Sequence, residues 1–109
     1  MYVRSGNGGG SGTLQETTIA DYNIPANSSS TKSIGVTGAT IVAIYGNVKF
    51  LSQYAFVAYP LSDKLKLASS SSWSDSVVAT ISFSGYSYTI NSTSTSTAQL
   101  TNIKVIYEV

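Results

Sequence analysis

Trp73 is the residue of this chain whose type and surroundings most clearly suggest chemistry. It lies in the serine-rich segment SSSSWSDS, two residues before Asp75. An exposed indole can stack on the apolar face of a sugar ring, while nearby hydroxyls and a carboxylate hydrogen-bond the ring hydroxyls. The opposite interpretation is that Trp73 folds back and caps one end of the domain, because large aromatic side chains are well buried on average. The segment therefore predicts either a sugar platform or a structural cap.

Tyrosines are the second group of candidates, because Tyr is enriched where a surface must contact a partner at low entropy cost. The tyrosines considered are Tyr54, Tyr59, Tyr86 and Tyr88. We expect most of them in the core and one or two at the surface. The predicted ligand-binding residues are Trp73, Asp75, Tyr86 and Tyr88.

The absence of His and Cys from the sequence removes most catalytic and metal-binding chemistry. A nucleophilic Ser needs a base within hydrogen-bond reach, which is almost always His, and zinc sites are built mainly on His and Cys. A Ser and Lys pair, or a lone Ca²⁺ held by backbone carbonyls, remains as an alternative, but no DxDxDG-type spacing is present. We expect no catalytic activity, no metal site and no cofactor.

Two carboxylates, Asp63 and Asp75, flank the segment Lys64 to Ala68 and could approach one another. Glycoside hydrolysis needs two carboxyl groups at a fixed separation across the scissile bond. We interpret the two residues instead as solvated turn residues. The glycines at 6 to 12 do not follow a strand and precede no Lys-Ser/Thr, so they form no phosphate loop.

The elements that must position these residues are short strands. Lys64 to Ala68 alternates Lys and Leu, and Tyr54 to Tyr59 places Tyr54, Phe56 and Ala58 on one face. A hairpin is predicted with Val77, Ala79, Ile81 and Phe83 on its buried face, returning through Tyr86, Tyr88 and Ile90. Ile103, Val105, Tyr107 and Val109 alternate inward in a last strand that includes the final residue.

Two segments break the simple alternation. Residues 17 to 24 form a mixed strand that ends at Pro25 and is expected at a sheet edge. Gly46-Asn47 interrupts the apolar strand that starts at Ala39, and this break is either a hairpin or a bulge, of which we favour the hairpin. Trp73 falls in the loop between two predicted strands.

These segments give about eight strands with turn signals every eight to twelve residues, and no helical period. The pattern predicts an all-β fold, an antiparallel β-sandwich with jelly-roll or Greek-key connections. A chain of 109 residues suffices for one such domain and one core. We place the sandwich at residues 14 to 109.

Residues 1 to 13 form a Gly/Ser-rich segment that is interpreted as a flexible arm, a linker or a cloning remnant. As an arm it would attach the domain to a neighbouring subunit. Tyr2 and Val3 would anchor it, and Gly8, Gly9 and Gly10 would allow close approach of two backbones.

Charge is sparse: six Lys and Arg oppose five Asp and Glu, giving a net charge of +1. No run of one sign steers the molecule to nucleic acid or to an acidic membrane. Apolar runs such as Ile41 to Tyr45 are far shorter than the roughly 18 residues of a membrane-spanning helix. We therefore expect neither nucleic-acid binding nor membrane insertion.

A neutral, Ser/Thr-rich sandwich with a Gly-rich lead and the final strand LTNIKVIYEV resembles virion structural proteins of tailed bacteriophages. The resemblance covers residues 14 to 109 and extends to distal tail-fibre, receptor-binding and head-fibre domains. It implies synthesis in the host cytoplasm, assembly into the virion, commonly as a homotrimer, and contact with a host surface glycan or decoration of the capsid. It assigns no role to a single residue.

Two functions are therefore expected. The first is a phage virion structural protein, located in the virion, whose partners are copies of itself (a trimer is favoured), other virion proteins and a host surface glycan. The alternative is a carbohydrate-binding module of a larger secreted protein or adhesin, with an extracellular location. Both act by binding.

Overall fold

The computed structural model describes residues 13–68 and 72–109, which form nine antiparallel strands. The strands are β1 (Leu14–Ile19), β2 (Tyr22–Ile24), β3 (Ser29–Ser33), β4 (Thr40–Lys49), β5 (Gln53–Ala58), β6 (Lys64–Ala68), β7 (Trp73–Ser84), β8 (Ser87–Ser92) and β9 (Ala98–Glu108). The predicted fold class, all-β and antiparallel, is confirmed.

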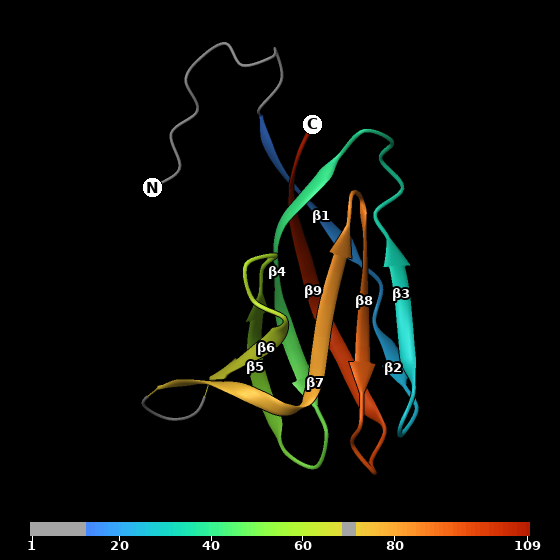
Figure 1. Ribbon diagram of the computed structural model, residues 1–109, viewed down its shortest axis with the longest axis vertical. Coiled ribbons are helices and arrows are strands. Elements are labelled where there is room, and N and C mark those ends of the chain that lie inside the picture. Colours follow the sequence, from blue (N-terminus) through green and yellow to red (C-terminus); the bar gives the residue numbers. More distant parts are fainter. Residues whose placement is uncertain (1–12, 69–71) are drawn as a thin grey trace.

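The strands follow one another in the order β1-β9-β4-β5-β6-β7-β8-β3, and β2 also pairs with β9. Strands β4 to β8 form a meander of consecutive neighbours, after which β9 returns beside β4 by a connection of the Greek-key kind. The sheet curls, so that β3, β8 and the end of β7 lie in front of β4, β9 and β2 (Figure 1). The core lies between these two layers.

Alternation correctly predicted most of the core. Phe56 and Ala58 of β5, Leu65 of β6, and the β9 side chains Ile103 and Val105 are all buried. Further residues of β9 and of other strands complete this core: Ile24, Ile41, Ile44, Val48, Ala79, Ile81, Tyr88, Ile90, Ala98 and Leu100. The period of two in these strands therefore reports burial on one face.

A pair of tyrosines connects the two layers. The hydroxyl oxygens of Tyr22 in β2 and Tyr88 in β8 lie 3.2 Å apart and share a hydrogen bond. Burial raises the pKa of both hydroxyls, and the neighbouring Tyr88 raises the pKa of Tyr22 further. The Lys32 ammonium of β3 lies 4.3 Å from the centre of the Tyr22 ring. The outermost strands β2 and β3 are thus linked through side chains.

The predicted hairpin at Gly46-Asn47 is wrong, because β4 continues through both residues. The register between β4 and β9 shifts here, and Asn102 opposite takes a positive φ of 52°. Asp21 accepts a hydrogen bond from the Asn102 backbone N–H at 3.1 Å. A Cβ at Gly46 would lie 3.0 Å from the carbonyl oxygens of Thr101 and Asn102. Because glycine has no side chain, the β9 backbone can approach β4 closely at this β-bulge.

A sharp bend in β7 corrects a second prediction. Trp73 to Asp75 pair with β6, whereas Ala79 to Ser84 pair with β8. Between the positions that pair with Lys64 and Lys66, β7 contains three more residues than β6 does. In this extra segment the Val78 carbonyl accepts a hydrogen bond from the Thr93 N–H at 2.8 Å. Val77 therefore points outward and is 93% exposed, not buried beside Ala79. Figure 1 shows the resulting change of strand direction.

Two strand ends also differ from the prediction. The mixed strand expected over residues 17 to 24 is divided at Ala20-Asp21 into β1 and β2, both of which pair with β9. The last strand ends at Glu108, so Val109 lies outside it. The Asp21 side chain explains the division, because it turns to the bulge residue Asn102.

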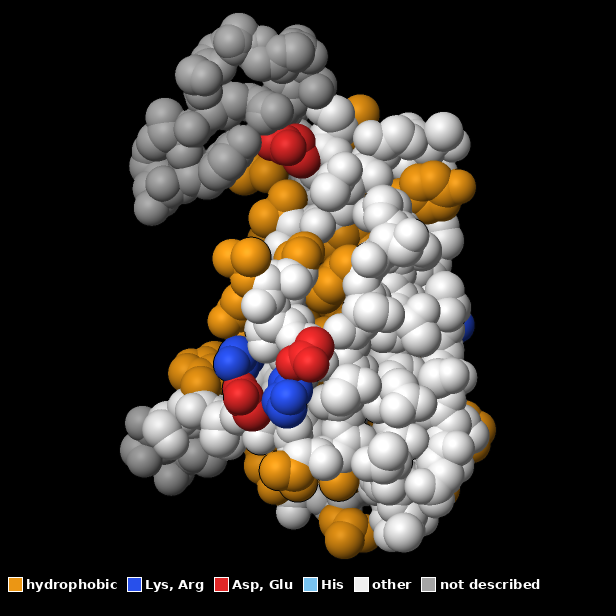
Figure 2. All heavy atoms as spheres, in the orientation of Figure 1, with side chains coloured by type: hydrophobic (Ala, Val, Ile, Leu, Met, Phe, Trp, Pro, Cys, Tyr) orange, Lys and Arg blue, Asp and Glu red, His pale blue; other side chains and the backbone are white. Residues whose placement is uncertain are grey.

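An uncharged outer surface covers β3, β8 and the end of β7. Its side chains form three cross-strand rows, and we call this surface the hydroxyl face. The rows are Ser29-Asn91-Thr80, Thr31-Thr89-Ser82 and Ser33-Ser87-Ser84. The Thr31 and Thr89 hydroxyl oxygens lie 2.7 Å apart. Figure 2 shows this part of the surface almost without charged or hydrophobic side chains.

Candidate functional site

Trp73 begins β7 and pairs with Ala68 of β6, so its predicted placement in a loop is wrong. Its side chain is 56% exposed and does not cap the sandwich. Of the two interpretations offered by the sequence, the exposed aromatic agrees with the structure. The pairing with β6 fixes the Trp73 backbone at the end of a ladder.

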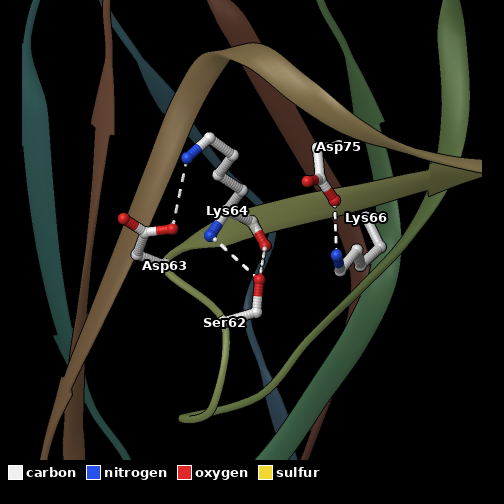
Figure 3. A network of polar contacts seen from close by, with 5 residues as sticks. All are labelled: Ser62, Asp63, Lys64, Lys66 and Asp75. Carbon is white, nitrogen blue, oxygen red and sulfur yellow. Dashed lines mark hydrogen bonds and ion pairs between the residues drawn. The ribbon is translucent and has the colours of Figure 1, made fainter.

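Asp75 lies on the same side of β7 as Trp73, because the two are separated by one residue. The strand registers place Val57 beside Lys66 and Lys66 beside Asp75, giving one cross-strand row on the outer surface. The Lys66 ammonium donates a hydrogen bond to the Asp75 carboxylate and forms an ion pair with it (Figure 3). The row therefore presents a donor and an acceptor side by side.

An open cleft of about 540 Å³ lies over this row. Its lining consists of Val57, Tyr59, Lys66, Trp73, Ser74 and Asp75, and we call it the Trp73 cleft. Two aromatic side chains, an ion pair and a serine hydroxyl thus meet at one surface. Such a lining offers apolar contact together with a few oriented polar groups, which suits a small polar ligand with an apolar face.

The charges around the cleft are balanced. The Lys64 ammonium lies 3.3 Å from the Asp63 carboxylate, and Ser62 hydrogen-bonds both the backbone N–H and the carbonyl of Lys64 (Figure 3). The hydrogen bond to Asp75 is the chief cause that raises the pKa of Lys66. Each carboxylate thus has its own lysine.

The two remaining predicted ligand residues lie elsewhere. Tyr88 is only 1% exposed and belongs to the core, so its assignment to a ligand surface is wrong. The same alternation that buries Ile90 buries Tyr88. Tyr86 is 39% exposed, but it lies at the turn after β7, at the opposite end of that strand from Trp73. Neither tyrosine lines the Trp73 cleft.

Tyr59, Val57 and Lys66 complete the cleft but were not among the predicted ligand residues. The sequence did hold a signal, because alternation sets Val57 and Tyr59 on the face of β5 opposite to the buried Phe56. It did not show that Trp73 would pair beside this face. That placement depends on the β6 to β7 register.

A second cleft of about 450 Å³ lies on the other side of the same strands. Phe50, Tyr54 and Leu67 provide apolar lining, the exposed Leu51 and Val77 flank it, and hydroxyls of residues 94–96 face it. Ser74 and Asp75 line both clefts, so the start of β7 separates them.

In residues 13–68 and 72–109, no three acidic residues gather where they could hold a metal ion. The same part of the chain contains no helix of the length and hydropathy needed to cross a membrane. The predicted arm residues Tyr2, Val3, Gly8, Gly9 and Gly10 lie outside the described residues.

Comparisons with protein-family models, with curated proteins and with solved structures found no match to this chain.

Proposed function

We propose that this domain is a non-catalytic binding module of a bacteriophage virion, and that its Trp73 cleft takes a glycan. The half-exposed indole of Trp73 beside the Lys66 and Asp75 ion pair is the observation that carries the proposal. Exposing an indole to water is unfavourable, so covering it with the apolar face of a sugar ring stabilises the complex.

The energetics fit a sugar ring stacked on the indole. Covering about 60 Å² of apolar surface at roughly 25 cal/mol per Å² stabilises the complex by about 1.5 kcal/mol, or about tenfold in affinity. Lys66 donates hydrogen bonds and Asp75 accepts them, so together they serve a pair of neighbouring ring hydroxyls. Tyr59 provides a second aromatic wall.

The hydroxyl face supports the assembly part of the proposal. It presents nine uncharged polar side chains on three neighbouring strands, so copies of the chain can approach without like-charge repulsion. The virion location and the favoured trimer follow from the sequence resemblance. In this arrangement the cleft contacts a glycan of the host surface while the hydroxyl face contacts other subunits.

A carbohydrate-binding module of a secreted protein or adhesin is the second candidate. The half-exposed indole of Trp73 supports it, because an aromatic platform for a sugar ring is enough for such a module without any assembly surface. Light scattering separates the two functions. A stable trimer supports the virion protein, whereas a monomer that binds glycans supports the secreted module.

The glycan part is tested with Trp73→Ala on a glycan array, followed by titration calorimetry of the sugars that bind. We expect binding to fall at least about tenfold, and stability to change by no more than about 1 kcal/mol because just over half of the residue is exposed. Leu61→Ala is the matched control, since Leu61 is 96% exposed and lines neither cleft. Unchanged binding in Trp73→Ala, or no binding by the unaltered protein, contradicts the proposal.

A further inference from the structure

The charge arrangement of the Trp73 cleft restricts the kind of sugar that fits. Lys66 and Asp75 are the charged residues of its lining, and they are paired with one another. We propose that the cleft accepts uncharged sugar rings and that Asp75 is the residue that excludes carboxylated ones. This inference rests on the proposed glycan function and deepens it.

The first step of the argument concerns Lys66. A cation is the strongest attraction that a cleft can offer to a sugar carboxylate, and Lys66 is the cation that lines this cleft. Its ammonium already donates to the Asp75 carboxylate, which neutralises its charge. The next lysine on the same strand, Lys64, is paired in the same way with Asp63. Each ammonium therefore attracts a further anion less strongly than an unpaired lysine would.

The second step concerns Asp75 itself. A sugar carboxylate that approached Lys66 would lie beside the Asp75 carboxylate, and like charges at this distance repel. An acidic ring would therefore have to displace Asp75 from Lys66 and leave that carboxylate without its partner.

The third step concerns an uncharged ring. Its hydroxyls are both donors and acceptors, so they can bond Lys66 and Asp75 at once without separating them. The ion pair then offers one strong donor and one strong acceptor in a fixed cross-strand relation, set by the register of β6 and β7. Trp73, on the same side of β7 as Asp75, supplies the stacking surface.

Pairs of oligosaccharides that differ by a carboxylate test the inference. The probes are galactose and galacturonic acid oligomers, glucose and glucuronic acid oligomers, and mannose and mannuronic acid oligomers. Titration calorimetry of the unaltered protein at low salt should show that the uncharged member of the bound pair has an affinity at least about tenfold higher.

Asp75→Asn is the decisive variant, since it keeps the side-chain shape and removes the charge. It should raise the affinity for the carboxylated member about tenfold, and 0.5 M salt should remove this gain because it screens the freed Lys66. The double variant Asp75→Asn with Lys66→Gln should show no such gain in affinity for the carboxylated member. Thermal melting checks that each variant is folded. If Asp75→Asn is unstable, Lys66→Gln alone is tested in its place, and this variant should show no gain in affinity for the carboxylated sugars.

The outcomes separate the two proposals. If the protein binds an uncharged oligomer but binds its carboxylated partner equally well or better, the inference is wrong and the glycan function stands. If Asp75→Asn leaves the ratio of the two affinities unchanged, Asp75 does not set the selectivity. If no oligomer binds to the unaltered protein, the proposed glycan function fails and the inference fails with it.

Discussion

The tyrosine pair between the two layers, of which Tyr88 is buried and Tyr22 partly buried, should make the domain lose stability at alkaline pH. Tyr22 and Tyr88 share a hydrogen bond between the two layers, and burial is the chief reason that the pKa of each hydroxyl is raised. In the unfolded chain Tyr22 titrates at its usual pKa of 10.0. Above that pH the unfolded state loses a proton that the folded state keeps, so the free energy of unfolding falls as pH rises.

The magnitude follows from the difference in bound protons. With the folded Tyr22 still protonated, the unfolded state gains about 1.4 kcal/mol at pH 11 from ionisation of this residue. The limiting slope is about 1.4 kcal/mol per pH unit for each tyrosine held in this way. At or below about pH 8 both states keep the proton, and the contribution is constant.

Urea denaturation followed by circular dichroism at pH 8, 10 and 11 measures this slope. Tyr22→Phe removes the titrating group. Between pH 8 and 11 the free energy of unfolding of this variant should therefore fall by about 1.4 kcal/mol less than that of the unaltered protein. Its baseline stability at pH 8 is lower, because the Tyr88 hydroxyl loses its partner, but the change with pH does not depend on that baseline. Identical declines in Tyr22→Phe and the unaltered protein would refute the reasoning.

Two substitutions at the bulge between β4 and β9 test the backbone argument. Gly46→Ala should destabilise by about 1 to 3 kcal/mol, because the new Cβ would lie 3.0 Å from backbone oxygens of β9; an unchanged melting temperature would contradict this. Asn102→Ala should lower the free energy of unfolding by about 1 to 2 kcal/mol, because the backbone φ at this position is 52°. Asn102→Gly should leave it nearly unchanged, because glycine adopts a positive φ readily. Equal effects of the two substitutions in denaturation experiments would show that φ is not the cause.

Strands with one buried face were predictable from the sequence, and the reason is local. In β6 and β9 each side chain's neighbours along the chain fix which face it takes, so Leu65, Ile103 and Val105 were assigned correctly. The burial of Tyr88 follows from the same rule, since it alternates with Ile90. Its assignment to a ligand surface came from the general enrichment of Tyr at contact surfaces, which does not say which face of β8 this tyrosine takes.

The bends could not be predicted, because distant pairings create them. Val77 is turned outward only because β7 pairs with β6 before it and with β8 after it. Gly46 continues a strand only because β9 approaches it closely. The Trp73 cleft has the same origin, since serine-rich sequence around Trp73 gives no local strand signal. Its exposed indole was one of two predicted alternatives, but its neighbours Tyr59 and Lys66 depend on register.

The hydroxyl face has a consequence for the environments that the protein can tolerate. Its nine side chains include no group that titrates and no charge that dissolved ions can screen. A subunit contact made through this face would therefore hold equally in fresh water, in brine, and in acidic or alkaline surroundings. The Trp73 cleft depends on an ion pair, so its binding properties change with salt and pH. One small domain thus combines a surface insensitive to its medium with a surface that responds to it.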